Sequence, residues 1–273
     1  MTRAAAPPAP RLVIKDELCA RVEVCDSSSG KVVRKTYRDR PFLLWRTFLR
    51  RARAGREFRN LSFTRDAGIP CVEPRDWGET RRLGCVPSSW LETGYVEDAI
   101  ALSRVIRAMD PMDHEALSLR RRLAKEFGTL IRSLHQAGIV WGTLTTRNLL
   151  LVQQSERPRL LACDMPRAMR FGRSVLGTRR ALVDLFNACF SPTRCREFSR
   201  SDRCAMLLCY CGGSRAELRR LWRALHGRSR WRNRAETGTL LAVYSLLTPL
   251  RGKLAPREFS RRSSPEGPPR RTA

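Results

Sequence analysis

The sequence predicts an α+β fold of two lobes, with a small antiparallel sheet in the N-terminal lobe and a helical C-terminal lobe. Three observations lead to this prediction. Strand-like runs joined by a turn-forming segment lie near the N-terminus, and helical stretches fill the second half. Between them, residues 134–164 give a helix end, a polar loop, a strand, a turn and a second strand that closes on an Asp.

The bulk composition is that of a soluble globular protein. At 273 residues the chain can bury a sizeable core, and its apolar content is 42% against 29% charged residues. No stretch approaches the roughly 18 apolar residues of a membrane span. The N-terminus also lacks the apolar core of a secretory signal. We therefore expect a cytoplasmic protein without a transmembrane segment.

The charge balance is strongly positive. The net charge is +27, and only five of the 53 basic residues are Lys. A charge of this size indicates anionic partners such as phosphates, acidic glycolipids or a membrane surface. The alternative is a general enrichment in Arg, because the Arg residues are not gathered into one stripe. A nucleic-acid binder ranks last, since no basic motif interleaved with aromatic residues supports it.

The first predicted elements are two strands at residues 18–24 and 32–37. The segment 26–30 between them has the Asp, Ser and Gly composition of a hairpin turn. Lys35 lies near the end of the second strand. With so few Lys in the chain, its position gains weight, because a compact ammonium and a planar guanidinium are not interchangeable at a crowded phosphate.

A long helical stretch follows at residues 42–63, as one helix or two. It contains Glu57 among six Arg residues, and Gly68-Ile69-Pro70 then ends the helix and begins an extended segment. A hairpin is predicted at residues 81–94. Its last four residues, Leu91-Glu92-Thr93-Gly94, are the candidate connector between the lobes.

The second half begins with predicted helices at residues 98–108 and 116–136, the latter apolar on one face. Gly138 ends this helix, and a polar loop leads to a strand that starts at Leu149. A second apolar run ends at Asp164. The sequence then predicts further helices, at residues 179–190, 201–210, 215–226 and 237–247.

These elements define four predicted segments. An Ala/Pro-rich N-terminus at residues 1–10 and a basic low-complexity tail at residues 254–273 are predicted to be disordered. The N-lobe is predicted at residues 11–94 and the C-lobe at residues 95–253.

Five features in chain order resemble the lipopolysaccharide kinase (Kdo/WaaP) family, a bacterial branch of the protein-kinase-like fold. They are Lys35, Glu57, Gly68-Ile69-Pro70, the loop from Gly142 to Asn148, and Asp164. The similarity spans residues 18–225. The matching stretches read Val32-Val33-Arg34-Lys35-Thr36-Tyr37-Arg38, Arg56-Glu57-Phe58-Arg59-Asn60-Leu61, Leu134-His135-Gln136-Ala137-Gly138-Ile139-Val140 and Asn148-Leu149-Leu150-Leu151.

The resemblance implies phosphorylation of a sugar hydroxyl in the lipopolysaccharide inner core with ATP and Mg²⁺, at the cytoplasmic face of the inner membrane. Lys35 would hold the ATP phosphates, Glu57 would orient Lys35, and Glu92 would lie in the connector that contacts the nucleotide. Asn148 and Asp164 would coordinate Mg²⁺. The implied partners are ATP and an anionic glycolipid or anionic membrane surface.

The sequence departs from the family pattern at the loop. The family's catalytic Asp falls on Thr143, and its loop His falls on Trp141. A Thr hydroxyl can hydrogen-bond an acceptor but cannot serve as a comparable base. Two hypotheses remain open. One is a weakly active sugar kinase with Thr143 and Asp164 as its catalytic residues, and the other is a pseudokinase that binds a nucleotide or partner without phosphotransfer.

Overall fold

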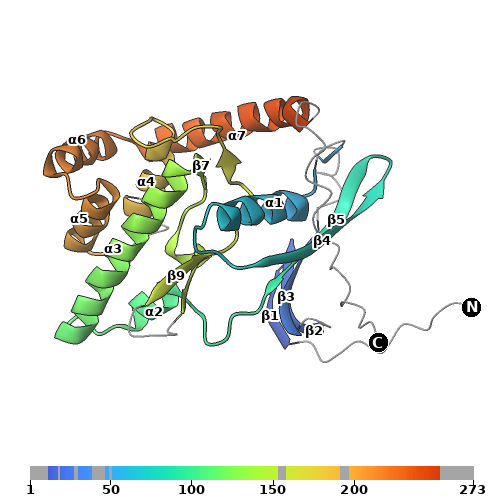
Figure 1. The fold of residues 1–273 in the computed structure, drawn as a ribbon, viewed down its shortest axis with the longest axis horizontal. Coiled ribbons are helices and arrows are strands. Elements are labelled where there is room, and N and C mark those ends of the chain that lie inside the picture. The colour runs from blue at the N-terminus through green and yellow to red at the C-terminus, as the bar shows by residue number, and fades with distance from the viewer. Residues whose placement is uncertain are drawn as a thin grey trace, which may run out of the picture.

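The computed structural model describes most of the chain, namely residues 12–17, 19–27, 30–38, 47–48, 51–152, 158–190 and 197–252. The two segments predicted to be disordered, residues 1–10 and 254–273, lie outside these ranges. Within them, the chain forms a sheet-based N-terminal lobe and a helical C-terminal lobe (Figure 1). The predicted α+β class and two-lobed layout are confirmed.

The N-terminal lobe is built on a five-stranded antiparallel sheet with the strand order β1-β2-β3-β5-β4. The predicted strands correspond to β2 and β3, and the predicted hairpin is part of a longer one formed by β4 and β5. The bounds are β1 (Leu12–Glu17), β2 (Ala20–Ser27), β3 (Gly30–Arg38), β4 (Pro74–Arg82) and β5 (Cys85–Gly94).

One helix, α1 (Arg53–Asp66), packs on this sheet. It covers only the second half of the range predicted as helical, part of which lies outside the described residues. Helix and sheet approach closely at Gly55, where a Cβ atom would lie 2.6 Å from the ring of Trp77. The helix ends before Gly68, whose φ of +72° is easily adopted only by Gly.

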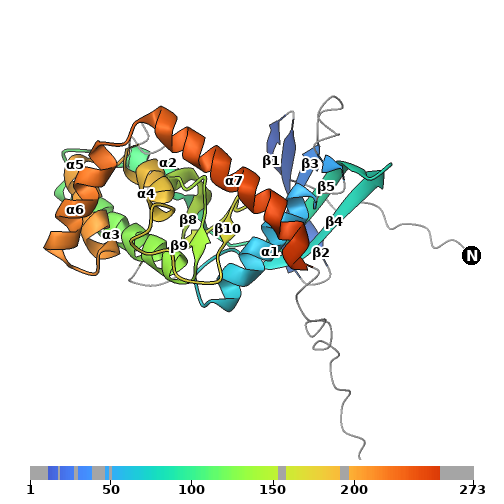
Figure 2. The same cartoon turned by 90° about the horizontal axis from the view of Figure 1, so that it is seen from above.

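The C-terminal lobe is organised around the long helix α3 (His114–Gln136), which packs against α5 (Arg200–Tyr210). Their backbones meet at Gly128, where a Cβ atom would lie 2.1 Å from the carbonyl oxygen of Met206. The other helices are α2 (Leu102–Ala108), α4 (Ala181–Cys189), α6 (Arg215–His226) and α7 (Arg230–Gly252). Helix α7 extends from the helical lobe toward the sheet lobe in both views (Figures 1 and 2).

Short strands hold the segment between α3 and α4. The strands β6 (Ile100–Ala101), β8 (Leu149–Val152) and β9 (Arg159–Ala162) form one small sheet, and β7 (Ile139–Val140) pairs with β10 (Met169–Arg170). None of the described helices is long and apolar enough to cross a membrane.

The two lobes are joined by backbone hydrogen bonds next to the end of α1. The amide of Val72 donates to the carbonyl of Ala162 at 3.0 Å, and the amide of Ala162 donates to the carbonyl of Pro70 at 3.0 Å. A single cluster of buried apolar residues also includes side chains from both lobes. Residues 70–72 therefore lie against β9, which ends two residues before Asp164.

Three predicted boundaries are wrong. Residues 91–94 are the end of β5 and pair with β3, so the connector to the helical lobe follows Gly94. The helix predicted from Asp98 begins at Leu102, because Asp98 has a φ of +54° and residues 100–101 pair with β8. The last helix begins at Arg230 rather than at residue 237.

Candidate active site

The structure brings Lys35, Glu57 and Asp164 together from three elements. Lys35 is on β3 and Glu57 is on α1, whereas Asp164 lies two residues after the end of β9. The Nζ atom of Lys35 contacts Oδ1 of Asp164 and lies 3.6 Å from Oε1 of Glu57. A cation of the sheet lobe therefore pairs with a carboxylate of the helical lobe where the two lobes meet.

Glu57 is held in a buried position, and its side chain is only 2% exposed. Burial raises its pKa, an effect that the neighbouring Lys35 ammonium opposes. The hydroxyl of Tyr37 donates a hydrogen bond to Oε2 of the same carboxylate. Burial would lower the pKa of Lys35, but Glu57 and Asp164 outweigh it and raise that pKa. Lys35 therefore carries its positive charge at neutral pH.

Asp164 adopts a backbone conformation that a non-Gly residue rarely takes, with a φ of +58°. The indole Nε1 of Trp141 donates to its carbonyl oxygen at 3.1 Å. Trp141 is fully buried, so the donor side of this bond is shielded from water. Trp141 thus holds the backbone of Asp164. Such strained conformations are concentrated at functional sites.

The loop after α3 is anchored by Asp184 of α4. Its carboxylate accepts from the amide of Trp141 at 2.6 Å and from the amide of Gly142 at 2.7 Å. His135 Nε2 lies 3.3 Å from the same carboxylate, and Asn187 donates to the carbonyl of Gly142 at 3.2 Å. Sequence reasoning gave Asp184 no role. The sequence feature that points to Asp184 is that it is a single acidic residue in the mostly apolar helix α4.

Thr143 and Asn148 lie in this loop and are half-buried. Asn148 Nδ2 donates to the carbonyl of Thr143 at 3.2 Å, which holds the two ends of the loop together. The amide of Cys163 donates to the carbonyl of Asn148 at 2.9 Å. Asn148 is therefore placed beside the residue that precedes Asp164.

Glu92 does not join this group. It pairs with Arg34 in the β3–β5 register, whereas Lys35 pairs with Leu91. Because side chains alternate between the faces of a strand, Glu92 and Lys35 lie on opposite faces of the sheet. Oε1 of Glu92 accepts from Arg34 Nε at 2.8 Å.

The oxygen donors fit a Mg²⁺ ion that arrives with a nucleotide. Mg²⁺ is usually held by one or two carboxylates together with phosphate oxygens and water. Asp164 offers a carboxylate with Lys35 beside it as a cation for phosphates, and Asn148, whose backbone is bonded to Cys163, offers an amide oxygen. In the described part of the chain, no group of three or more His, Cys, Asp or Glu side chains could hold a metal ion. A metal here would need phosphate oxygens to complete its coordination.

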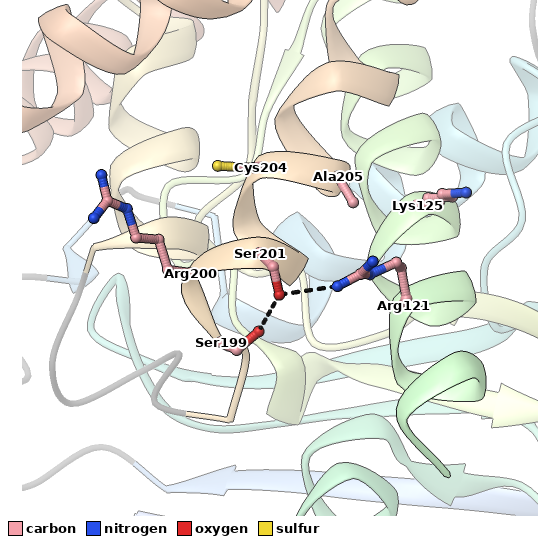
Figure 3. A pocket seen from close by; sticks show the side chains of 7 residues that line it. All are labelled: Arg121, Lys125, Ser199, Arg200, Ser201, Cys204 and Ala205. Carbon is pink, nitrogen blue, oxygen red and sulfur yellow. Dashed lines mark hydrogen bonds between the residues drawn. The ribbon is translucent and has the colours of Figure 1, made fainter. Parts of the chain in front are cut away.

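A separate basic pocket lies between α3 and α5, with a volume of about 820 Å³ (Figure 3). The guanidinium of Arg121 donates to the hydroxyl of Ser201 at 3.0 Å, and the hydroxyls of Ser199 and Ser201 are 2.9 Å apart. None of the predicted site residues lines it. Its lining consists of Arg121, Lys125, Ser199, Arg200, Ser201, Cys204 and Ala205.

Comparison with known proteins bears on the family and the fold of this chain. The Lipopolysaccharide kinase (Kdo/WaaP) family matches residues 25–210. A solved structure described as "WaaP in complex with acyl carrier protein" is similar with a TM-score of 0.55 and 17% sequence identity, and the match covers 85% of this chain and 88% of that chain. No curated protein sequence matches. The structural match confirms the protein-kinase-like fold.

Proposed function

Because this chain belongs to the lipopolysaccharide kinase (Kdo/WaaP) family, we propose that it transfers the γ-phosphoryl group of ATP to a sugar hydroxyl of the lipopolysaccharide inner core, with Mg²⁺. The observation that carries the proposal is the position of Lys35 between Glu57 and Asp164. Phosphoryl transfer requires a cation on the phosphates and oxygen ligands for the metal, and Lys35 and Asp164 are side chains of the kinds that these two roles need.

Each residue of the group has a distinct task in this proposal. Lys35 binds the phosphates of ATP, and Glu57 keeps the Lys35 ammonium directed at them. Asn148 and Asp164 would hold Mg²⁺, which neutralises the charge that develops on the phosphoryl oxygens. Tyr37 fixes the Glu57 carboxylate through its hydroxyl, so that one oxygen remains turned to Lys35.

Thr143 would position the acceptor hydroxyl without taking its proton as a carboxylate does. General acid–base catalysis contributes about 10²–10⁴-fold to a rate, so the loss of the Asp at this position predicts slow transfer. Positioning of the two substrates and electrostatic stabilisation remain available, because the loop that carries Thr143 is held by Asp184 and Asn148.

The second candidate function is a pseudokinase that binds a nucleotide or a partner. The observation that favours it is the position of Trp141, which fills the family's His site with a fully buried ring that hydrogen-bonds the backbone of Asp164. Such a loop keeps its shape without a catalytic base. In this reading Lys35 and Asp164 bind the nucleotide, and no phosphoryl transfer follows.

We also propose a location at the cytoplasmic surface of the inner membrane, where the lipid-linked acceptor would be reached. The net charge of +27 supports it, since a basic protein is attracted to an anionic leaflet.

Nucleotide binding is tested by a Mg²⁺-dependent thermal shift with ATP. We expect the wild-type protein to be stabilised, and Lys35→Ala and Asp164→Asn to lose the shift. Two control variants should keep the ATP-dependent thermal shift. Lys31→Ala removes another Lys of the same strand as Lys35, and Asp98→Asn changes another Asp with positive φ. If ATP and Mg²⁺ give no shift with the wild-type protein, both nucleotide-dependent functions are wrong.

Transfer is tested on purified inner-core glycolipid with labelled ATP. We expect slow incorporation by the wild-type protein and faster incorporation by Thr143→Asp. The kinase proposal is rejected in favour of the pseudokinase if ATP binds but neither the wild-type protein nor Thr143→Asp labels any core sugar.

A further inference from the structure

The hairpin of β4 and β5 projects from the sheet on the side of the molecule opposite α5 and α6, in both views (Figures 1 and 2). Its last pair is Arg82 with Cys85, which leaves a loop of Leu83 and Gly84. Both loop residues have positive φ, +48° and +79°. A two-residue loop with two positive φ angles is a type I′ turn, in which the first position favours Asn, Asp or Gly.

Leu83 is therefore an unusual residue for its backbone. A left-handed conformation brings the Cβ of a Leu close to its own backbone, a cost that Gly avoids and Asn tolerates. Packing within the chain does not offset this cost, because Leu83 is 96% exposed. Single exposed Leu residues are common, but this one combines full exposure with a strained backbone at the end of a projecting hairpin. A contact outside the chain would supply the missing stabilisation.

The residues next to Leu83 are basic. Arg81 Nη1 donates to the carbonyl of Gly84 at 3.1 Å, and its Nε donates to Glu79 at 2.5 Å, so it braces the turn. Arg82 is exposed and has no carboxylate partner within 4.0 Å among the described residues. Among the described residues, the acid paired with Arg81 is Glu79, whose other carboxylate oxygen accepts from the amide of Ala52. The tip thus presents an apolar side chain beside cations.

We propose that this tip, residues 81–84, docks on an anionic phospholipid membrane, with Leu83 inserted among the lipid chains and Arg82 on lipid phosphates. An apolar group and basic charge together bind an anionic membrane more strongly than either alone, and the tip offers both. A lipid surface fits better than a protein groove because the apolar part is one side chain on a narrow projection. The idea rests on the proposed function only in that the acceptor glycolipid is membrane-bound.

The decisive variant is Leu83→Asn. The membrane role predicts that it weakens vesicle binding, whereas the turn conformation predicts that it does not lower thermal stability. Asn suits a positive φ, so thermal stability should be kept or raised. Binding to vesicles of phosphatidylglycerol and phosphatidylcholine should fall about tenfold, since an inserted Leu side chain is lost. Met112→Asn removes another large apolar side chain, 83% exposed, from the other lobe and should leave binding unchanged.

The charge component is tested with Arg82→Gln. Its binding to the anionic vesicles should fall about fivefold, and the difference from wild type should shrink as salt is raised. Arg219→Gln removes an exposed charge from α6 and serves as the matched control.

The proposal is overturned if Leu83→Asn binds the anionic vesicles as tightly as wild type, or if Met112→Asn loses as much binding as Leu83→Asn. It is also overturned if Leu83→Asn instead reduces the molecular mass measured by light scattering, which would assign the tip to contact with a second copy. The Mg²⁺-ATP thermal shift of Leu83→Asn should equal that of wild type. Failure of the docking proposal is therefore separate from failure of nucleotide binding.

Discussion

The hydroxyl of Tyr37 donates a hydrogen bond to the carboxylate of Glu57, so that a residue of β3 fixes the helix acid that faces Lys35. Both side chains are buried, and Lys35 lies two residues before Tyr37 on the same strand. The orientation of the Lys35–Glu57 pair is thus set from the sheet as well as from α1.

Tyr37→Phe should destabilise the protein without enlarging or shrinking the core. Glu57 would keep a buried oxygen without its donor, which costs about 1–3 kcal/mol in free energy of unfolding. The pKa of Glu57 should also rise further, because the lost bond favours the charged form. Urea unfolding measures the first effect. Tyr95→Phe, at an exposed Tyr, should change stability by less than about 0.5 kcal/mol, and an equal loss in both variants would contradict the buried bond.

The ionisation of Tyr37 should make the protein less stable at alkaline pH. Burial, with Glu57 and Asp164, raises its pKa above the ordinary value of 10.0. The stabilisation that protonated Tyr37 contributes is therefore fully present below pH 10.0 and is lost as the pH rises further, because Tyr37 loses its proton first in the unfolded state. Above that pH, the free energy of unfolding of the wild-type protein should fall by about 1.4 kcal/mol per pH unit more than that of Tyr37→Phe. Equal slopes in urea unfolding from about pH 9 to 11 would show that Tyr37 is not protected by burial.

Asp184→Ala should loosen the loop that carries Thr143. Two buried amides, those of Trp141 and Gly142, would lose their acceptor, and we expect a cost of about 3 kcal/mol. Hydrogen exchange at these two amides should accelerate more than at the rest of the lobe. Asp113→Ala removes the N-cap of α3 and should cost only about 1 kcal/mol. Unchanged exchange in Asp184→Ala would disprove the anchoring role.

Trp141→Phe should separate ring packing from hydrogen bonding. The Phe ring fills much of the space but cannot donate to the carbonyl of Asp164, so we expect a loss of about 1–3 kcal/mol and weaker Mg²⁺-ATP binding. Trp231→Phe, at a side chain that is 78% exposed, is the control and should be within about 0.5 kcal/mol of wild type. A titration with Mg²⁺-ATP, followed by thermal shift, measures the affinity of each variant for the nucleotide. Wild-type affinity in Trp141→Phe would mean that the indole bond does not position Asp164.

Gly128→Ala should force α3 and α5 apart. The new Cβ would lie 2.1 Å from the carbonyl oxygen of Met206, and overpacking of this kind costs about 1–3 kcal/mol. Gly172→Ala is the matched control, because its Cβ would meet no atom within 4 Å. Calorimetry should show a lowered melting temperature for the first variant alone. Equal melting temperatures would indicate that the helices can separate at no cost.

Much of the fold could be predicted because local patterns agree with the tertiary structure. The apolar face of α3, the turn before β3 and the end of α1 at Gly68 are all expressed in short stretches of sequence. The order and spacing of Lys35, Glu57 and Asp164 also indicated that they belong together, and they do lie together. Their roles in binding ATP and Mg²⁺ remain predictions.

Other features depend on packing that the sequence does not express. Asp184 contacts a loop more than forty residues earlier, so its role follows only from how α4 docks. The position of Glu92 depends on strand register, and a shift of one residue reverses the face on which a side chain lies. At Trp141 the sequence predicts only the absence of the His that the resemblance implies, whereas the bond of its indole to Asp164 follows from the closeness of two separate segments.

Helix α1 is attached to both lobes. Asn60 of α1 donates to the carbonyls of Met165 and Ala168 at 2.9 and 3.0 Å, and the chain after α1 is bonded to β9. The Tyr37 hydroxyl and the close packing of Gly55 on Trp77 tie the same helix to the sheet. A displacement of one lobe relative to the other would therefore have to break either the Asn60 bonds or these sheet contacts, so α1 is a structural bridge that fixes the spacing of Lys35 and Asp164.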